Sequence, residues 1–477
     1  MFLLAQKEKA SILSRGNFQH VSGVPSEVSN VPTVAPAPTS VEEVMRITAA
    51  MRQQHFPDSP DNHSRVTDVR PSLTIGPDSG DLKGADDKVI QAGIDYLARM
   101  GGGTLQILPG TYAIHNALAL RSNVHIKGNG SDTILRKAKG FSTPLAQDAD
   151  WFETAVVVAD ASGFSPGSGV MIQSRKPGSE GMAGLTVAKA VVTRIEGNVV
   201  SLDRHLEKEY RAGNTPRLTS SFAILTGEKL ADIRIERLVL DGNKDENEFI
   251  DGNLAGAIFL KFCDRIAFSE VVAQNYNGDG FSVQACNDLR FERCTARDNA
   301  KFGFHAGSGS TNTLLIQVVS AGNVEGIFFC WGVNNTIVYQ SDCSRNRDYG
   351  ISIGYRDTDN LIQGCTFENN GKTGILFREA KVDFEGAHRN VVTSCVIKDN
   401  GGSDGDGIGI DIRGYNHDLV ITENDLVNSA EGHQASGIRV FPEAQRVNLQ
   451  GNRFKGQQNS LDASKPLKDT IKALLGR

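Results

Sequence analysis

The segment from Asp264 to Gly456 alternates apolar and polar residues in a short pattern that returns about every two dozen residues. In the copy GISIGYR, for example, Ile351 and Ile353 flank Ser352. Alternation with a period of two is typical of a β-strand, and a fixed period of this size is typical of a repeat architecture. Each copy opens at a glycine, and the glycines are Gly280, Gly303, Gly326, Gly350, Gly374, Gly407 and Gly437.

A series of asparagines runs in phase with the glycines, a few residues before each of them. Asparagine tolerates the left-handed backbone of a sharp corner, so we expect each repeat to read strand, corner, strand, loop. Cys294, Cys365 and Cys395 each precede a corner by five positions, which predicts an inward column of small apolar side chains. The corner asparagines are Asn275, Asn299, Asn323, Asn346, Asn370, Asn400 and Asn428.

Stacked repeats of this kind pair each strand with the strands above and below it in parallel sheets. With rungs such as NDLRFERCTARDNAKFGFHAG, the sequence resembles the right-handed parallel β-helix proteins of the pectate-lyase-like superfamily. The predicted fold class is therefore all-β, a right-handed parallel β-helix solenoid with an N-terminal helical cap and a small antiparallel β insertion.

The cap is the second point of resemblance. In GADDKVIQAGIDYLARMGGGTLQILPG, the residues Ile90, Ile94, Leu97 and Ala98 share one helical face, and three glycines end the helix. This opening resembles that of pectate-lyase-like hydrolases, lyases and phage tailspikes, in which a helix plugs the end of the solenoid. An open end would expose core and unpaired strand edges, which gives the cap a physical purpose.

Outside the repeat, the two-dozen-residue period is lost, and this loss indicates where other segments begin and end. Ser40 and Glu43 match a capping box that predicts a short helix near the start. The expected segments are an extended or disordered lead-in at 1–39, a helix and linker at 40–83, the cap and first rungs at 84–156, a β insertion at 157–225, the main stack at 226–459 and a tail or closing helix at 460–477.

The composition excludes some classes of binding partner. The formal net charge of −6 gives no basic footprint for nucleic acid or an anionic membrane, and no apolar run approaches the ~18 residues of a membrane span. All seven cysteines lie between Cys263 and Cys395, an odd number without a C-x-x-C pair, so we expect reduced packing residues. The start MFLLAQKEKASILSRG lacks the features of a secretory signal, whereas the resemblance implies a secreted or periplasmic protein, so the compartment stays open.

Residues at one offset from the glycine form a column on one face of a solenoid. Four positions after the glycine, and just beyond, this face mixes cations, aromatic rings and carboxylates. Such a mixture suits an acidic glycan, because rings stack on sugars and arginine forks bind carboxylates. The alternative is an ordinary polar face on which arginine and glutamate pair. The expected substrate-binding residues are Lys261, Gln284, Trp331, Tyr355, Arg356, Arg439 and Glu443.

The densest cluster of charge lies in GILFRE and SDGDGIGIDIRG. Counted from Gly374 and Gly407, Arg378 and Asp411 share one offset in neighbouring rungs, which predicts that they pair. This geometry fits a catalytic carboxylate held by arginine and equally fits a structural salt bridge. The expected catalytic residues are Asp411, Glu379, Arg378, His305 and Arg413.

Asp279 in NGDGF resembles the strand start of polygalacturonase-type glycosidases, but Tyr349 stands where that family places a histidine. We therefore interpret Asp279 as a turn residue. Asp404, Asp406 and Asp411 offer oxygens that could bind Ca²⁺, but no EF-hand-like loop and no His or Cys ligand spacing is present. We expect no metal and no other cofactor.

Two functions remain open. The first is a lyase or hydrolase that cleaves an acidic, uronate-containing polysaccharide. In the lyase form, Arg378 or Arg413 neutralises the uronate and His305 is the base; in the hydrolase form, Asp411 and Glu379 are the acid and the base or nucleophile. The second is a non-catalytic, tailspike-like glycan-binding or structural protein, for which the resemblance implies a homotrimer.

Overall fold

The computed structural model describes residues 71–179, 182–402 and 407–463 of the chain. The predicted lead-in, the helix at Ser40, Asp404, Asp406 and the closing helix after residue 463 lie outside the described residues. Within them, no helix is both long and apolar enough to cross a membrane.

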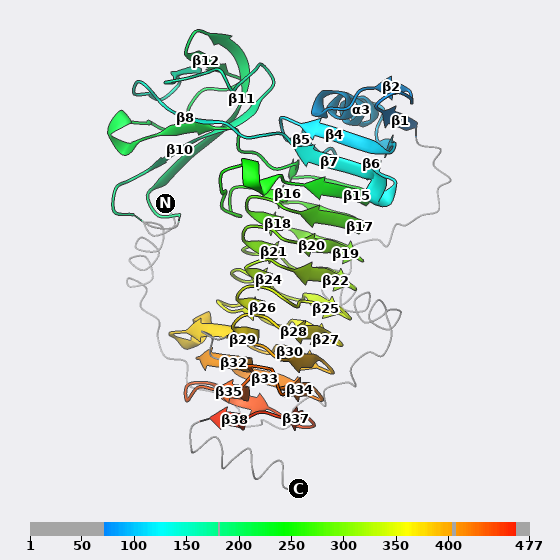
Figure 1. Cartoon of the computed structure of the whole chain (residues 1–477), viewed down its shortest axis with the longest axis vertical. Coiled ribbons are helices and arrows are strands. Elements are labelled where there is room, and N and C mark those ends of the chain that lie inside the picture. Colours follow the sequence, from blue (N-terminus) through cyan, green and yellow to red (C-terminus); the bar gives the residue numbers. More distant parts are fainter. Residues whose placement is uncertain (1–70, 180–181, 403–406, 464–477) are drawn as a thin grey trace, which may run out of the picture. The chain divides into compact units, whose positions relative to one another are not determined.

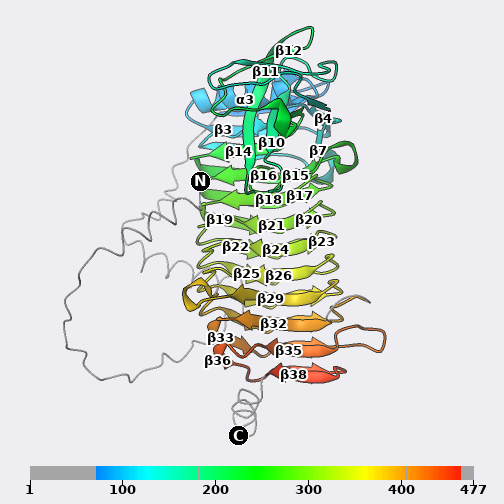
Figure 2. The ribbon, with the colours of Figure 1, turned by 90° about the vertical axis from the view of Figure 1, so that its left-hand side faces the viewer.

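The described part of the chain is built mainly of parallel strands stacked rung upon rung (Figures 1 and 2). One sheet, here called the glycine sheet, contains the strand that opens at the glycine of each repeat. Within the described residues it has eleven strands in the order of the chain, so each rung contributes one strand. They are β5 (Leu118–Ala119), β14 (Leu225–Glu228), β16 (Gly256–Lys261), β18 (Asp279–Gln284), β21 (Phe302–Ala306), β24 (Glu325–Phe329), β26 (Tyr349–Ile353), β29 (Thr373–Ala380), β32 (Ile408–Gly414), β35 (Ser436–Val440) and β38 (Asn459–Ala463).

The remaining strands of the rungs form the other parallel sheets of the solenoid. They are β15 (Ala231–Asp241), β17 (Asp264–Gln274), β19 (Asn287–Glu292), β20 (Thr295–Arg297), β22 (Leu314–Ile316), β23 (Val319–Ala321), β25 (Ile337–Tyr339), β27 (Leu361–Gln363), β28 (Thr366–Glu368), β30 (Val391–Thr393), β31 (Val396–Lys398), β33 (His417–Thr422), β34 (Asp425–Val427), β36 (Gln445–Asn448) and β37 (Arg453–Lys455). The prediction of a parallel β-helix is confirmed.

The glycines are required because neighbouring rungs approach closely at this point. A Cβ on Gly326 would lie 2.4 Å from the carbonyl oxygen of Gly350, and one on Gly374 would lie 2.8 Å from that of Gly409. The series therefore continues through Gly409 and not through Gly407. The expectation at Gly407 was wrong by two residues, and this shift changes which side chains face each other in that rung.

The asparagines of the corners form a buried ladder. Asn346 accepts a hydrogen bond at Oδ1 from the backbone N–H of Asn323, and its Nδ2 donates to Asn370 Oδ1 at 3.1 Å. The left-handed backbone lies one residue earlier, as at Arg345 with φ of 57°. Most of these asparagines thus serve the corner through side-chain hydrogen bonds, and our expectation of a left-handed conformation was wrong for them. It holds for Asn275, whose φ is 51°. Gln434, not Asn428, ends the series by bonding Asn400.

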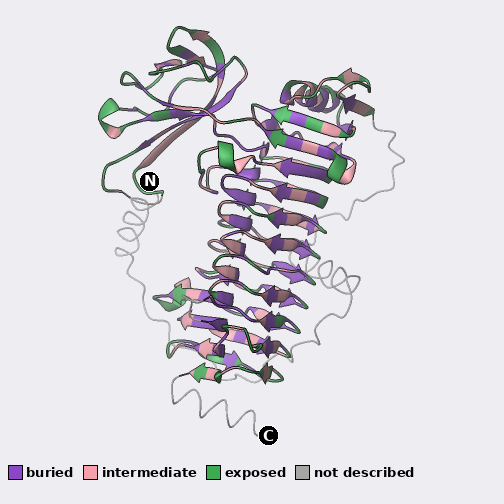
Figure 3. Ribbon diagram, in the orientation of Figure 1, coloured by how far each residue is buried: buried purple, intermediate pink, exposed green. Residues whose placement is uncertain are grey.

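Buried residues follow the strands of every rung (Figure 3), and the apolar ones among them form one continuous core cluster. Phe281 and Phe304 stack in parallel with ring centroids 4.7 Å apart, as strands in register require. Cys294, Cys365 and Cys395 are buried there as predicted, and all seven cysteines are free.

The helical cap is confirmed as α3 (Asp87–Arg99). Asp86 caps it by accepting from the backbone N–H groups of Lys88 and Val89, and Ile90, Ile94 and Leu97 are buried. The strands around it are β1 (Ser72–Gly76), β2 (Leu82–Lys83), β3 (Gly103–Ile107), β4 (Gly110–Ile114), β6 (Val124–Lys127) and β7 (Thr133–Lys137).

An antiparallel sheet with its own small core interrupts the rungs. Its strands are β8 (Ser142–Pro144), β9 (Ala155–Val157), β10 (Gly169–Arg175), β11 (Leu185–Glu196), β12 (Val199–Leu202) and β13 (Arg217–Thr219). The insertion therefore takes in residues from Ser142, earlier than the boundary at 157 that loss of the period indicates.

Candidate functional site

The outer face of the glycine sheet carries polar and aromatic side chains that the register brings together. Two positions after the glycine, His305 pairs with Phe328, Phe328 with Ser352, and Asp411 with Arg439 in successive strands. Most of these side chains are buried although they point outward, because side chains of adjacent rungs and loops cover them.

Asp279 and His305 form a buried ion pair on this face. His305 Nδ1 lies 2.7 Å from Asp279 Oδ2, and the two side chains are 1% and 0% exposed. Asp279 Oδ1 also accepts from the backbone N–H of Phe302. Burial lowers the pKa of His305, but the hydrogen bond and charge of Asp279 outweigh it and raise this pKa to about 9. His305 therefore carries a proton at neutral pH.

This pairing corrects two expectations. We expected Asp279 to be a turn residue, and it is instead the partner that orients His305. The lyase form requires His305 to be a base that substrate can reach, and His305 is instead 2% exposed. Its Nε2 atom has no hydrogen bond within the described residues. The neighbouring Cys330 interacts with it: burial raises the pKa of the Cys330 thiol, but His305 outweighs that effect and the pKa is lowered.

Glu325 on β24 repeats the geometry of Asp279 on β18, two rungs further on. Its Oε2 accepts a hydrogen bond from Ser352. Ser352 lies in the rung after Glu325, two positions after the glycine, just as His305 lies in the rung after Asp279. Burial raises the pKa of Glu325, against the opposing hydrogen bond of Ser352 and the charge of Arg378. The carboxyl group is thus biased towards its protonated form, as a proton donor requires.

Arg378 lies beside these groups with a fixed guanidinium. It donates to Ser352 Oγ at 3.0 Å and to the carbonyl oxygens of Phe329 and Cys330, and its ion pair with Asp357 spans 3.4 Å. Burial raises the pKa of Asp357 to about 7 in spite of the Arg378 charge. Asp357 therefore neutralises Arg378 only in part near neutral pH.

Aromatic rings frame Arg378 and extend from it. The guanidinium carbon lies 4.7 Å from the centroid of Phe328 and 5.3 Å from that of Tyr355. Tyr355 stacks on Trp331 with centroids 5.2 Å apart, and Arg356 covers the Trp331 ring at 5.4 Å. Trp331 and Tyr355 are partly exposed and Arg356 is exposed. These predicted residues are therefore brought together with Arg378.

The sequence led us to expect that Asp411 pairs with Arg378, and this expectation was wrong. In the register Asp411 faces Leu376, since Gly409 is the glycine of its rung. Its carboxylate is fully buried and is held by Arg413 Nε at 2.5 Å and by Arg439 Nε at 2.9 Å. With both oxygens occupied, this cluster has the character of a structural ion triad.

The other predicted residues lie apart from Arg378 or take a different role. Glu379 and Glu443 are exposed, Lys261 pairs with Glu228 at 3.1 Å, and Gln284 donates to Ser282. Sequence reasoning missed Glu325, Ser352 and Asp357. A signal in the sequence would have found Glu325 and Ser352. In this pair, as in the pair of Asp279 and His305, an acid just before the glycine of one rung is followed by a polar residue two positions after the glycine of the next rung.

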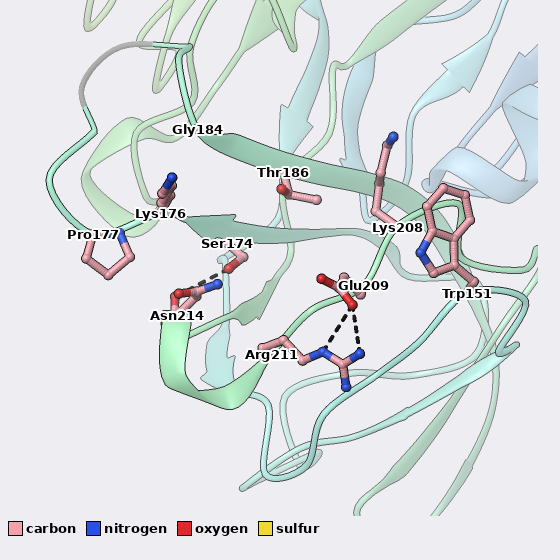
Figure 4. Close-up of a pocket in the computed structure, with 10 residues that line it drawn as sticks. All are labelled: Trp151, Ser174, Lys176, Pro177, Gly184, Thr186, Lys208, Glu209, Arg211 and Asn214. Carbon is pink, nitrogen blue, oxygen red and sulfur yellow. Dashed lines mark hydrogen bonds and ion pairs between the residues drawn. The ribbon is translucent and has the colours of Figure 1, made fainter. Parts of the chain in front are cut away.

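A separate pocket of about 680 Å³ lies in the insertion (Figure 4). Lys208 lies over the Trp151 ring at 5.2 Å, whereas Arg211 is already paired with Glu209 at 2.7 Å. The lining residues are Trp151, Ser174, Lys176, Pro177, Gly184, Thr186, Lys208, Glu209, Arg211 and Asn214.

Comparisons with known proteins agree on the fold. Residues 256–402 match the family described as "Right handed beta helix region". No curated protein matches the sequence. The A-module of the Azotobacter vinelandii mannuronan C-5 epimerase AlgE6 is 16% identical with a TM-score of 0.51, over 79% of this chain and 91% of that chain.

Two further structures are similar to lower degrees. The AlgE4 A-module of the same organism is 14% identical with a TM-score of 0.48, over 79% and 95% of the two chains. PfbA, a surface adhesin of Streptococcus pneumoniae, is 12% identical with a TM-score of 0.49, over 79% and 90%. The expected right-handed parallel β-helix repeat is confirmed by the family match and by the stacked parallel strands.

Proposed function

We propose that this right-handed β-helix protein is an enzyme that cleaves an acidic polysaccharide on the outer face of β21, β24, β26 and β29. The observation that carries the proposal is that a cation and a protonatable acid share one hydroxyl group. Ser352 Oγ donates to Glu325, whose pKa is raised, and accepts from Arg378, which is fixed between aromatic rings.

Arg378 is suited to neutralise a uronate carboxylate. Its counter-ion Asp357 has a pKa of about 7 and so is only partly ionised. The stacked rings of Trp331 and Tyr355 offer a partly exposed apolar surface next to it, on which a sugar ring can lie. Together they favour an anionic glycan over a neutral one.

Glu325 is the proton donor of the proposed reaction. Cleavage of a glycosidic bond breaks a carbon–oxygen bond, and the leaving oxygen takes a proton in hydrolysis and in β-elimination alike. In hydrolysis, water supplies the oxygen that bonds to the sugar. In elimination, a base removes the proton at C5, the bond from C4 to oxygen breaks, and a C4=C5 double bond forms.

His305 takes a positioning role in this proposal. A base must be unprotonated, and with a pKa of about 9 His305 keeps its proton at neutral pH. Its fixed positive charge acts on Glu325 and Cys330. We therefore assign the proton transfer to Glu325 and not to His305.

Incubation with a panel of polyuronates tests the proposal, and the panel includes mannuronan, which is named for the two epimerase modules. New ultraviolet absorbance reports an unsaturated uronate and hence elimination, whereas new reducing ends without absorbance report hydrolysis. We expect Glu325→Gln to lower turnover by at least about 100-fold. The matched control is Glu270→Gln on β17, where Glu270 pairs with Arg293.

A second candidate function is glycan binding without cleavage, in an assembly such as a trimer. The stacked rings of Trp331 and Tyr355 favour it, because they can hold a sugar ring without any proton transfer. Saturable binding of a polyuronate with neither product would establish this function and exclude the enzyme. Light scattering tests the homotrimer, which stays a prediction, as does the expected lack of a cofactor.

A further inference from the structure

Two histidines and an aspartate meet where the chain leaves the glycine sheet after β29. His388 and His417 occupy equivalent positions of neighbouring rungs, three residues before the paired Val391 and Val420. Their rings stack with centroids 3.4 Å apart and planes 12° apart. Asp383 reaches them from the excursion between β29 and β30, with Oδ1 3.3 Å from His417 Nε2.

The three side chains offer one ligand atom each, and these atoms all lie within 4.8 Å of one another. We propose that Asp383, His388 and His417 bind a divalent transition-metal ion of the Zn²⁺ type. Two imidazole nitrogens and a carboxylate oxygen are a donor set that Zn²⁺ accepts, with a fourth position left for water.

The surroundings of His417 prepare it as a ligand. Its Nδ1 lies 2.7 Å from Asp418 Oδ2, so the ring proton is held there and Nε2 presents its lone pair towards Asp383. Asp418 is in turn fixed by hydrogen bonds from Arg446. A carboxylate behind a metal-binding histidine sets its tautomer and orientation.

His388 is buried against the ring of His417. Its Nε2 bonds the carbonyl oxygen of Asp383 at 2.8 Å. Its Nδ1 accepts from the backbone N–H of His417 at 3.3 Å. Metal binding at Nε2 replaces the bond to Asp383 and moves the ring proton to Nδ1, which gives up the bond from His417. It also requires the two stacked rings to splay apart.

The ring of His388 also requires glycine at position 386, in the excursion between β29 and β30. A Cβ on Gly386 would lie 2.2 Å from His388 Cε1 and 2.1 Å from the carbonyl oxygen of Tyr415. The neighbouring Glu385 accepts from the backbone N–H of Arg356 at 2.9 Å. A metal that ties Asp383 to the two rungs would therefore hold the excursion against the Arg356 side of the candidate site.

The test is a calorimetric titration of the chelator-treated full chain with Zn²⁺. We expect one saturable site, lost or weakened by at least about 10-fold in His388→Gln, His417→Gln and Asp383→Asn. The chain has ten histidines, so the control is His433→Gln, which alters an exposed histidine outside the cluster and should bind as the parent does. Circular dichroism verifies that each variant is folded.

Two further readouts do not depend on catalysis. Zn²⁺ should raise the melting temperature of the parent and of His433→Gln but not that of His417→Gln, since a ligand that binds the native state stabilises it. Co²⁺ should give a visible spectrum of four-coordinate geometry. Equal Zn²⁺ affinity of the parent and His417→Gln, or no saturable site in the parent, would overturn the proposal.

Discussion

Asp279 and His305 belong to successive rungs and form an ion pair of 2.7 Å between two side chains that are almost fully buried. Asp279 lies just before the glycine of its strand, and His305 lies two residues after the glycine of the next. The pair connects the repeat geometry to the electrostatics of the candidate site, because the carboxylate in one rung sets the charge of the imidazole in the next.

Replacing Asp279 should therefore change how stability depends on pH. The pKa of His305 is raised from 6.5 to about 9 in the fold, so its contribution is complete below pH 6.5 and is lost as the pH rises through 9. Asp279→Asn should lose about 3–5 kcal/mol at pH 6, as expected when one partner of a buried pair is removed. The loss should be smaller at pH 9.5.

Urea unfolding at the two pH values measures this difference. Asp264→Asn, which alters a partly exposed aspartate on β17, serves as the control. An equal loss at both pH values for Asp279→Asn would show that the pair contributes no pH-dependent stability.

The two tryptophans offer a matched test of glycan binding. Trp331 stacks on Tyr355 next to Arg378, and Trp151 lies in the insertion. Trp331→Ala should weaken the affinity for a bound polyuronate by about 2–10-fold, which is the range of one aromatic contact. Trp151→Ala should leave this affinity unchanged. The reverse order of effects would move the binding surface to the insertion.

Lys137 should limit stability at and below neutral pH. It is 1% exposed, and burial lowers its pKa from 10.5 to about 7, with Asn277 Oδ1 and the rings of Phe222 and Tyr276 as neighbours. The unfolded chain binds more protons between these values, so this group makes stability rise with pH from 7 to 10.5.

Lys137→Met should consequently stabilise the fold by a few kcal/mol below pH 7, given about 1.4 kcal/mol per pKa unit. The gain should shrink towards pH 10.5. Thermal unfolding across this range measures it, with Lys139→Met at an exposed lysine as the control. A gain that is independent of pH would contradict the assignment.

The asparagine ladder should contribute strongly to stability. Asn346→Ala removes the acceptor of the Asn323 backbone N–H and the donor to Asn370 and to the carbonyl of Ser320. Each buried group left unpaired costs about 1–3 kcal/mol. Denaturant unfolding should show a loss of at least about 2 kcal/mol, and the exposed Asn448→Ala should show much less. Similar values for both variants would refute the structural role of the ladder.

Local sequence patterns were sufficient to predict the solenoid, its cap and the columns of its glycine sheet. These follow from local rules: alternation sets the face of each side chain, and only glycine fits where Gly326 approaches Gly350. Counting from the glycine failed in the rung of Asp411. The connection before that strand is longer than in the preceding rung, and we took Gly407 for Gly409.

Tertiary structure alone decided which outward side chains are covered and which groups meet. His305 and Asp411 point outward by periodicity and are nevertheless buried, because neighbouring rungs supply the atoms around them. Asp383, His388 and His417 carry no spacing motif, since a loop and two rungs bring them together. Periodicity determines the direction of a side chain, whereas its charge and its partners depend on residues distant in sequence that only the stacking of rungs brings into contact.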